Sequence, residues 1–205
     1  MNSNDGTLPG FFPATVMPDP DWWQTLWPDP RRIVALLGVQ SGMDVVDLCC
    51  GDGLFTVPLA LLARRCIAID IDRGMLAAAR QKLDAAGTAN YDLIEGDAYD
   101  ISERVRQLVH FVLIANTFHG VPEKQRLADA VATVLSPEGR FAIVNWHRRP
   151  REETTVLGLP RGPKTELRMT PVDTATVVRS AGFRQVGLIE LPPYHYGAVF
   201  AKQSQ

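Results

Sequence analysis

Residues 43–53 read MDVVDLCCGDG, a short apolar run followed at once by a glycine-rich turn. An apolar run of this length, closing on Asp47, is typical of a strand that is covered on both faces of a parallel sheet. Gly51 and Gly53 allow the backbone to turn tightly and to pass close to a ligand, where a Cβ would collide. In open α/β sheets, ligands bind beyond the carboxyl ends of the strands, and this turn lies at such an end.

Apolar strands alternate with helices on both sides of this stretch. We expect strands over 43–49, 66–71, 91–97, 110–116, 141–146, 183–191 and 194–202, and helices over 31–37, 54–64, 73–86, 101–108, 122–135 and 171–181. Only Pro192 and Pro193 join the last two strands, and a connection that short requires an antiparallel pair. The predicted fold class is therefore α/β: a doubly wound, mostly parallel seven-stranded sheet with a C-terminal antiparallel pair, in a three-layer sandwich.

Residues 1–30 form an arm that is rich in proline and tryptophan. Proline removes helix donors and fixes φ, so we expect an irregular segment with one short helix near residues 21–26. The arm carries three tryptophans, Trp22, Trp23 and Trp27. Their combined apolar surface is too large to remain exposed to water, so we expect the arm to pack on the domain. The alternative is that the arm closes over a bound ligand as a lid.

Length and charge limit the class of protein. The chain has 205 residues, of which 46% are hydrophobic, and a formal net charge of −2, so we expect one domain over 1–205 and no bulk binding of nucleic acid. The longest apolar run, 54–63, is too short to cross a bilayer, and the first residues lack the pattern of a secretory signal. The three cysteines form neither a disulfide framework nor a paired zinc pattern. These features predict a cytoplasmic protein without a metal site, and they leave the oligomeric state open.

Three aspartates stand at the ends of the first three predicted parallel strands: Asp47, Asp70 and Asp97. At the second strand end, a carboxylate is placed to accept both hydrogens of a ribose diol, and at the third it can accept from an exocyclic amine. The alternative is that all three are helix caps or solvated loop ends, which aspartate also favours. A nicotinamide dehydrogenase would need G-x-G-x-x-G after the first strand, and Asp47 beside that loop would repel a pyrophosphate.

DLCCGDG (47–53), AIDID (68–72) and EGDA (95–98) together resemble the motifs of the class I, seven-stranded, Rossmann-like S-adenosylmethionine-dependent methyltransferases. The resemblance extends in element order from Arg31 to the C-terminus, and Cys49 stands where the first motif usually has a glycine. It implies an S-adenosylmethionine-dependent methyltransferase that binds this cofactor and releases S-adenosylhomocysteine. The implied cofactor-binding residues are Asp47, Cys49, Gly51, Gly53, Asp70, Ile71, Asp97, Ala98 and Asn116.

The groups that serve the methyl acceptor should lie past the fourth and fifth strands. Methyl transfer from a sulfonium needs alignment, and it needs a base where the acceptor carries a proton. His119 is our first candidate for a general base and His147 the second, since an unperturbed imidazole titrates near neutral pH. The alternative for each is a loop histidine that only hydrogen-bonds a neighbour.

Residues 147–168 are the most basic part of the chain. They hold six cations (Arg148, Arg149, Arg151, Arg161, Lys164 and Arg168) and three acids (Glu152, Glu153 and Glu166). Such a segment could orient an anionic small-molecule substrate, or it could be a solvated loop. A small-molecule methyltransferase is our leading interpretation. The alternatives are an RNA or protein methyltransferase and a non-catalytic module that binds S-adenosylmethionine.

Overall fold

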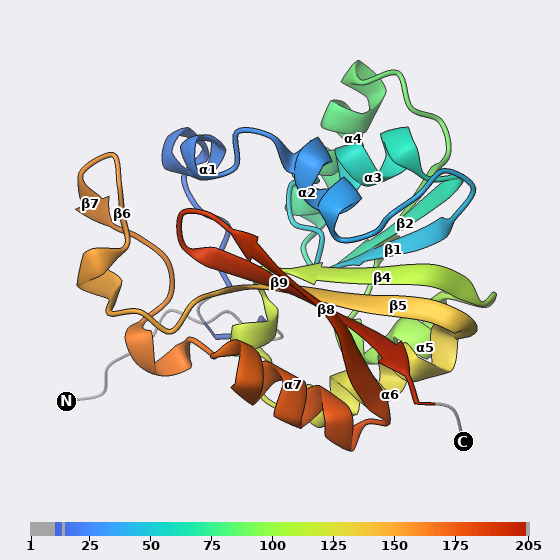
Figure 1. Ribbon diagram of the computed structural model, residues 1–205. Coiled ribbons are helices and arrows are strands. Elements are labelled where there is room, and N and C mark those ends of the chain that lie inside the picture. The colour runs from blue at the N-terminus through green and yellow to red at the C-terminus, as the bar shows by residue number, and fades with distance from the viewer. Residues whose placement is uncertain (1–10, 14, 204–205) are drawn as a thin grey trace.

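The computed structural model describes residues 11–13 and 15–203, and a seven-stranded sheet crosses the middle of the molecule (Figure 1). The strand order is β3-β2-β1-β4-β5-β9-β8. The strands are β1 Asp44–Leu48, β2 Arg65–Asp70, β3 Tyr91–Glu95, β4 Val109–Ala115, β5 Leu135–Trp146, β8 Phe183–Leu191 and β9 His195–Lys202. The first five run parallel, and β9 pairs antiparallel with both β5 and β8. The predicted fold class and the antiparallel final pair are confirmed.

Seven α-helices cover the two faces of the sheet in the described part of the chain. They are α1 Pro20–Leu26, α2 Pro30–Leu36, α3 Thr56–Leu62, α4 Arg73–Ala85, α5 Ile101–Arg104, α6 Lys124–Val134 and α7 Pro171–Ser180. Figure 1 shows α1 to α4 on one side and α5 to α7 on the other. Alternate residues of β1 therefore enter opposite cores: Val46 and Leu48 pack in one hydrophobic cluster and Val45 in the other. All five residues of β1 are buried, as a continuous apolar run predicts.

The turn after β1 uses backbone conformations that L-residues rarely adopt. Cys49 has φ +60°, although it carries a side chain, and Gly53 has φ +83°. A Cβ on Gly53 would lie 2.9 Å from the Cβ of Ala79 in α4. The glycine at position 53 is therefore needed for the left-handed turn and also for the close approach of α4.

The arm packs its tryptophans into the core beside α2 and α3. Trp22, Trp23 and Trp27 are 7%, 7% and 4% exposed, and they form successive edge-to-face ring contacts. Trp27 continues the row to Phe55, with ring centroids 5.2 Å apart. The first ten residues and Ala14 lie outside the described residues, so the structure bears on the arm only from Phe11 onward.

Three elements differ clearly from the predicted ones, and the first is α5, which ends at Arg104 rather than at residue 108. Strand β5 begins at Leu135 rather than at 141, because Leu135 pairs with Val109 of β4 before an irregularity in the register. The long loop before α7 contains a short antiparallel hairpin, β6 Thr155–Val156 and β7 Leu159–Pro160. Figure 1 shows this hairpin at the same end of the molecule as α1.

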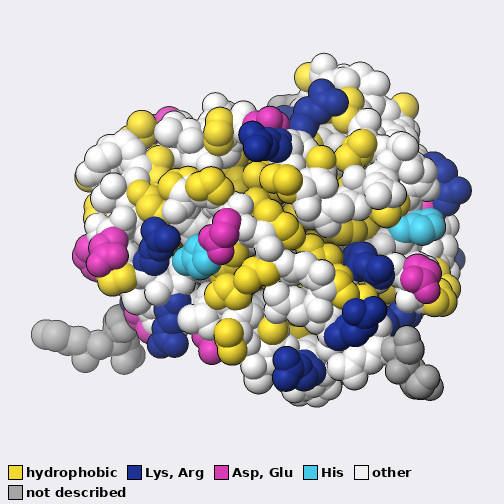
Figure 2. All heavy atoms as spheres, in the orientation of Figure 1, with side chains coloured by type: hydrophobic (Ala, Val, Ile, Leu, Met, Phe, Trp, Pro, Cys, Tyr) yellow, Lys and Arg dark blue, Asp and Glu magenta, His cyan; other side chains and the backbone are white. Residues whose placement is uncertain are grey.

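The strand at the edge of the sheet leaves apolar side chains in solvent. Val186 and Leu188 of β8 are 41% and 47% exposed. Figure 2 shows hydrophobic side chains across the middle of the face over which β8 passes in Figure 1. Within the described ranges, no helix combines the length and the apolar character that a membrane span requires.

Candidate functional site

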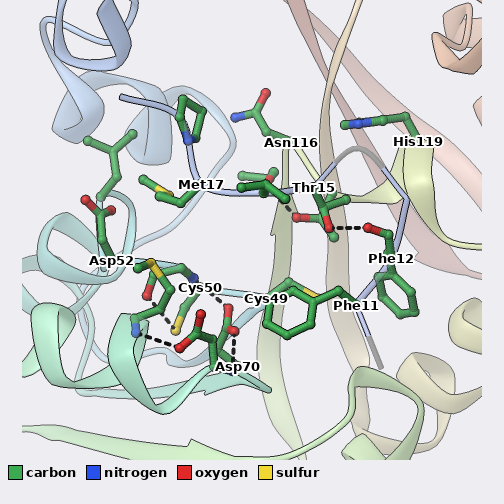
Figure 3. Close-up of a pocket in the computed structure, with 18 of the residues that line it drawn as sticks. Phe11, Phe12, Thr15, Met17, Cys49, Cys50, Asp52, Asp70, Asn116 and His119 are labelled. Atoms are coloured by element: carbon green, nitrogen blue, oxygen red, sulfur yellow. Dashed lines mark hydrogen bonds between the residues drawn. The ribbon is translucent and has the colours of Figure 1, made fainter. Parts of the chain in front are cut away.

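A cavity of about 770 Å³ opens beyond the carboxyl ends of β1 to β4 (Figure 3). Its lining comes from three parts of the chain: the loops that follow these strands, the arm, and the loop between β5 and α7. The volume falls in the upper part of the range of pockets that bind small molecules. Eight of the predicted cofactor residues line it: Asp47, Cys49, Gly51, Asp70, Ile71, Asp97, Ala98 and Asn116.

Asp70 fixes the loops that follow β1 and β2. Its Oδ2 accepts the Gly51 N–H at 2.8 Å, and its Oδ1 accepts the Asp72 N–H at 2.9 Å. Burial raises the pKa of Asp70, although the backbone hydrogen bonds oppose this. A carboxylate offers about four acceptor positions, so acceptor capacity beyond these two bonds is available to a ligand in the cavity.

Asp47 lies deeper, at the floor of the cavity. It is 2% exposed, and its Oδ2 accepts a hydrogen bond from the Thr56 hydroxyl at 2.6 Å. Burial raises the pKa of Asp47 to about 7, while the bond from Thr56 opposes the rise. A cation near Asp47 would favour the ionised carboxylate, so this residue is adapted to a positively charged ligand group.

Cys49 and Cys50 follow Asp47 and also line the cavity. Burial raises the pKa of both thiols well above their usual range, and the neighbouring carboxylates add to the rise. Both sulfurs are therefore neutral, and they present small apolar surfaces rather than nucleophiles.

Asp97 combines a capping role with a place in the cavity wall. Its Oδ1 accepts the Tyr99 N–H at 2.9 Å at the start of a 3₁₀ turn, Ala98–Asp100. Helix α4 is capped by Asp72 instead of Asp70, through Gly74 N–H at 2.7 Å. The alternative that these aspartates are helix caps therefore applies in part to Asp97, which caps the 3₁₀ turn. It does not apply to Asp47, whose carboxylate accepts a hydrogen bond from a side-chain hydroxyl.

Asn116 and His119 stand on the opposite wall of the cavity from Asp70 (Figure 3). Asn116 follows β4 with φ +59°, a strained value that asparagine tolerates better than most residues. Both polar atoms of its amide are buried, and neither has a hydrogen-bond partner among the described residues. His119 is 4% exposed in the 3₁₀ turn Phe118–Gly120.

Two predicted site residues lie outside the cavity lining. His147 donates a hydrogen bond from Nε2 to the Glu190 carboxylate at 2.9 Å, and its ring contacts Tyr196. Gly53 faces Ala79 of α4, as described above. His147 therefore fits the alternative of a loop histidine that hydrogen-bonds a neighbour.

The basic segment divides into two groups. Arg151, Arg161 and Lys164 line the cavity, whereas Arg148, Arg149 and Arg168 do not. Arg168 is 2% exposed, and its guanidinium donates to four oxygens of the segment itself: Pro163 O, Arg149 O, Arg161 O and Thr154 Oγ1. Burial lowers its pKa. Arg168 thus holds the loop together and is not available to orient a substrate.

The arm forms a part of the cavity wall that contains none of the sequence motifs. The arm packs closely on two glycines of the cavity loops. A Cβ added to Gly120 would lie 2.1 Å from Pro13 O, and a Cβ added to Gly51 would lie 3.3 Å from Met17 Sδ. Figure 3 shows the segment that carries Thr15 and Met17 crossing the cavity between Cys50 and Asn116. The cluster of tryptophans in the sequence is the signal that pointed to this wall.

Comparisons with known proteins agree with this geometry. The family model described as "Methyltransferase domain" matches residues 45–139, which include the ends of β1 to β4. These residues are therefore similar to a methyltransferase domain. Demethylmenaquinone methyltransferase of Shouchella clausii (strain KSM-K16) is 28% identical over 111 residues, which are 53% of this chain and 47% of that protein. The one from Bacillus cereus (strain B4264) is 22% identical over 135 residues, 64% of this chain and 54% of that protein. The chain spans about half the length of the curated relatives it matches.

Solved structures with the same fold cover most of the chain. A SAM-dependent methyltransferase from Aquifex aeolicus has a TM-score of 0.75 and 22% identity, with 90% of this chain and 94% of that one covered. A putative type 11 methyltransferase from Sulfolobus solfataricus has a TM-score of 0.67 and 23% identity, with 86% and 94% covered. The similarity in fold therefore extends well beyond residues 45–139, which the family model matches.

Proposed function

We propose that this chain is an S-adenosylmethionine-dependent methyltransferase that acts on a small molecule. The observation that carries the proposal is the convergence of Asp47, Asp70 and Asp97, from three successive strand ends, on one cavity. Such a row of acceptors suits a ligand with a cationic amino-acid end, a ribose diol and an exocyclic amine. A pyrophosphate-containing cofactor would be repelled by the same residues.

The polar groups of the cavity fit this cofactor. Asp70 has acceptor capacity left after its two backbone hydrogen bonds, and Asp47 is buried where an ammonium group would favour its ionised form. Asn116 has a buried amide without a partner in the described ranges, so it offers both a donor and an acceptor. The residues that would hold the cofactor are Asp47, Cys49, Gly51, Asp70, Ile71, Asp97, Ala98 and Asn116, and Gly53 shapes the turn that carries them.

When bound, S-adenosylmethionine supplies an activated methyl group, whose bond to the sulfonium sulfur breaks as a bond to the acceptor atom forms. The protein aligns the acceptor and keeps water out, which the arm segment around Thr15 and Met17 does by covering the cavity. We assign His119 as the group that accepts the proton of an acceptor N–H or O–H, because it is buried in the wall opposite Asp70. His147 is not given this role.

The substrate we propose is a small anionic molecule. Arg151, Arg161 and Lys164 bring positive charge to one wall of a cavity of limited volume, and the rest of that wall is apolar. A pocket of this size suits a small molecule better than a folded RNA or protein. We further propose that residues 1–205 form one domain and that the protein acts in the cytoplasm.

Calorimetric titration with S-adenosylmethionine tests the cofactor assignment. We expect micromolar binding, about −8 kcal/mol, that is lost in Asp70→Ala. Glu190→Ala is the matched control, since it removes an exposed carboxylate that contacts only His147 among the interactions described above. Absence of binding to folded, ligand-free wild-type protein would refute the cofactor assignment.

Formation of S-adenosylhomocysteine tests the activity itself. Cell extract is separated into a small-molecule fraction and a macromolecular fraction, and the second is assayed with and without nuclease. Product formed only with the small-molecule fraction supports the proposal. Product formed only with macromolecules would assign an RNA or protein substrate, according to the effect of the nuclease, and binding without any product would indicate a non-catalytic module.

A further inference from the structure

Charge is separated along the cavity. Among the residues that the structure describes, its acidic lining residues lie at the carboxyl ends of β1 and β2 or in the loops after β1, β2 and β3, and they are Asp47, Asp52, Asp70, Asp72 and Asp97. Its lysine and arginine lining residues all come from the loop between β5 and α7, and they are Arg151, Arg161 and Lys164. The acids of that loop, Glu152, Glu153 and Glu166, are absent from the lining. One end of the cavity is thus adapted to a cationic ligand and the other to an anionic one.

The three cations are not neutralised by neighbouring carboxylates. Within the described ranges, none of Arg151, Arg161 and Lys164 takes part in a salt bridge, although six such pairs occur elsewhere. Arg151 uses its Nε to donate to Gly162 O at 3.0 Å, which leaves the rest of its guanidinium for other partners. Their charge is therefore available to a ligand.

Arg161 is the most constrained of the three. Its guanidinium carbon lies 5.1 Å from the centroid of the Trp22 ring in the arm. Its Nε is buried and has no hydrogen-bond partner among the residues that the structure describes. A buried donor without an acceptor is costly, and a planar guanidinium presents paired N–H groups that match the two oxygens of a carboxylate.

The segment that carries Arg161 is held rigidly against an aromatic wall. Gly162 has φ +84°, and a Cβ there would lie 2.8 Å from two carbons of the Trp146 indole. Arg168 fixes the same segment from behind through Pro163 O and Arg161 O. The Trp22 and Trp146 rings provide the aromatic surface at this end. A flat apolar body beside a fixed guanidinium is the shape that this end can hold.

We infer that the methyl acceptor is an aromatic carboxylate whose carboxyl group binds Arg161 and whose ring lies against the tryptophan-lined wall. This inference rests on the proposed function and adds the substrate class to it. The carboxylate is the anchor, and the methylated atom is a different N or O of the same molecule, on the side of His119. Arg161 determines specificity, and Lys164 adds a weaker, exposed charge at the same end.

The test measures binding of three probes to the full chain saturated with S-adenosylhomocysteine: 2-naphthoate, 2-naphthamide and 2-naphthyl phosphate. We expect naphthoate to bind at least tenfold more tightly than naphthamide, a difference of about 1.4 kcal/mol. Arg161→Met keeps an unbranched apolar stem against Trp22, and it should lower naphthoate affinity at least tenfold while leaving naphthamide within about twofold. Arg148→Met is the matched control, since Arg148 is exposed on the same loop and lies outside the lining.

The outcomes separate this inference from the proposed function. If the wild-type chain fails to bind S-adenosylhomocysteine, the cofactor assignment fails. If it binds the cofactor product but prefers naphthamide, binds neither probe, or keeps its preference in Arg161→Met, the aromatic-carboxylate inference fails alone. Tighter binding of naphthyl phosphate than of naphthoate would also overturn it. Should Arg161→Met lose S-adenosylhomocysteine binding, Lys164→Gln decides: a roughly two- to fivefold loss of naphthoate affinity supports the inference, and no loss refutes it.

Discussion

Replacing Gly53 by alanine should destabilise the fold through two separable costs. The residue has φ +83°, and holding an L-residue in the left-handed region costs roughly 1–2 kcal/mol. The added Cβ would also lie 2.9 Å from the Cβ and 3.0 Å from the Cα of Ala79 in α4, and overpacking of this kind costs roughly 1–3 kcal/mol. The expected loss is therefore about 2–5 kcal/mol, from a total stability on the order of 5–15 kcal/mol.

Gly42→Ala isolates the backbone cost. Gly42 has φ +86°, and no atom lies within 4 Å of the position that its Cβ would take. Its substitution should cost only about 1–2 kcal/mol. Urea denaturation of both variants, followed by circular dichroism, gives the two free energies of unfolding.

Ala79→Gly provides a second check, because it removes the atom against which the new Cβ packs. Combined with Gly53→Ala in a double-mutant cycle, it should recover roughly 1–3 kcal/mol of the loss, after its own cost in the helix is measured separately. Equal destabilisation by Gly53→Ala and Gly42→Ala, together with no coupling in the cycle, would refute the packing argument.

Three further predictions concern buried side chains. Below the ordinary pKa of 3.8, Asp47 is protonated in folded and unfolded chains, and above about 7 it is ionised in both; between these values only the unfolded chain loses the proton. The stability of the cofactor-free protein should therefore fall as pH rises from about 4 to about 7, and thermal melts of Asp47→Asn should lack this component. His119→Gln should lower S-adenosylhomocysteine formation roughly 100-fold or more while changing cofactor affinity by less than about threefold, and unchanged turnover would remove His119 from the mechanism. Arg168→Met removes the four hydrogen bonds that the guanidinium donates within the loop, so denaturant unfolding should show a loss of about 3 kcal/mol or more. Arg148→Met, the exposed control, should stay within about 0.5 kcal/mol of wild type.

Most of the sheet could be predicted because its signals are local. Buried parallel strands read as short apolar runs, and the strands from β1 to β4 end within about two residues of the predicted positions. The antiparallel final pair followed from the length of one connection. The row of Asp47, Asp70 and Asp97 could be predicted for the same reason, since each stands directly at or just after a strand end.

The features that could not be predicted depend on unusual turns and on contacts distant in sequence. Hairpin β6–β7 turns on Leu157 and Gly158, which have φ +52° and φ +75°. Such a turn normally has asparagine or aspartate at its first position, so a leucine there reads as part of an apolar run. The early start of β5 is similar, because Pro137 and Gly139 read as a break.

The sequence also could not predict which basic residues of the 147–168 loop face the cavity and which hold the loop together. Arg161 and Arg168 are indistinguishable by composition, yet one lines the cavity and the other is buried behind it. What separates them is the tertiary placement of the 147–168 loop on the arm and on Trp146. His147 differs from His119 in the same way, since each follows the carboxyl end of a parallel strand, β5 or β4, and only His119 lines the cavity.

The two halves of the cavity differ in how the chain supplies them. The acidic half belongs to loops that are anchored at both ends by the sheet and its helices. Apart from Trp146 at the end of β5, the basic and aromatic half belongs to the arm and to the 151–164 segment, neither of which contributes a strand to the seven-stranded sheet. Changes confined to these two segments can alter the choice of acceptor while the cofactor half stays constant. The sheet and its strand-end loops can therefore stay unchanged while the arm and the 151–164 segment vary. New substrate selectivities can be selected or engineered in these two segments alone.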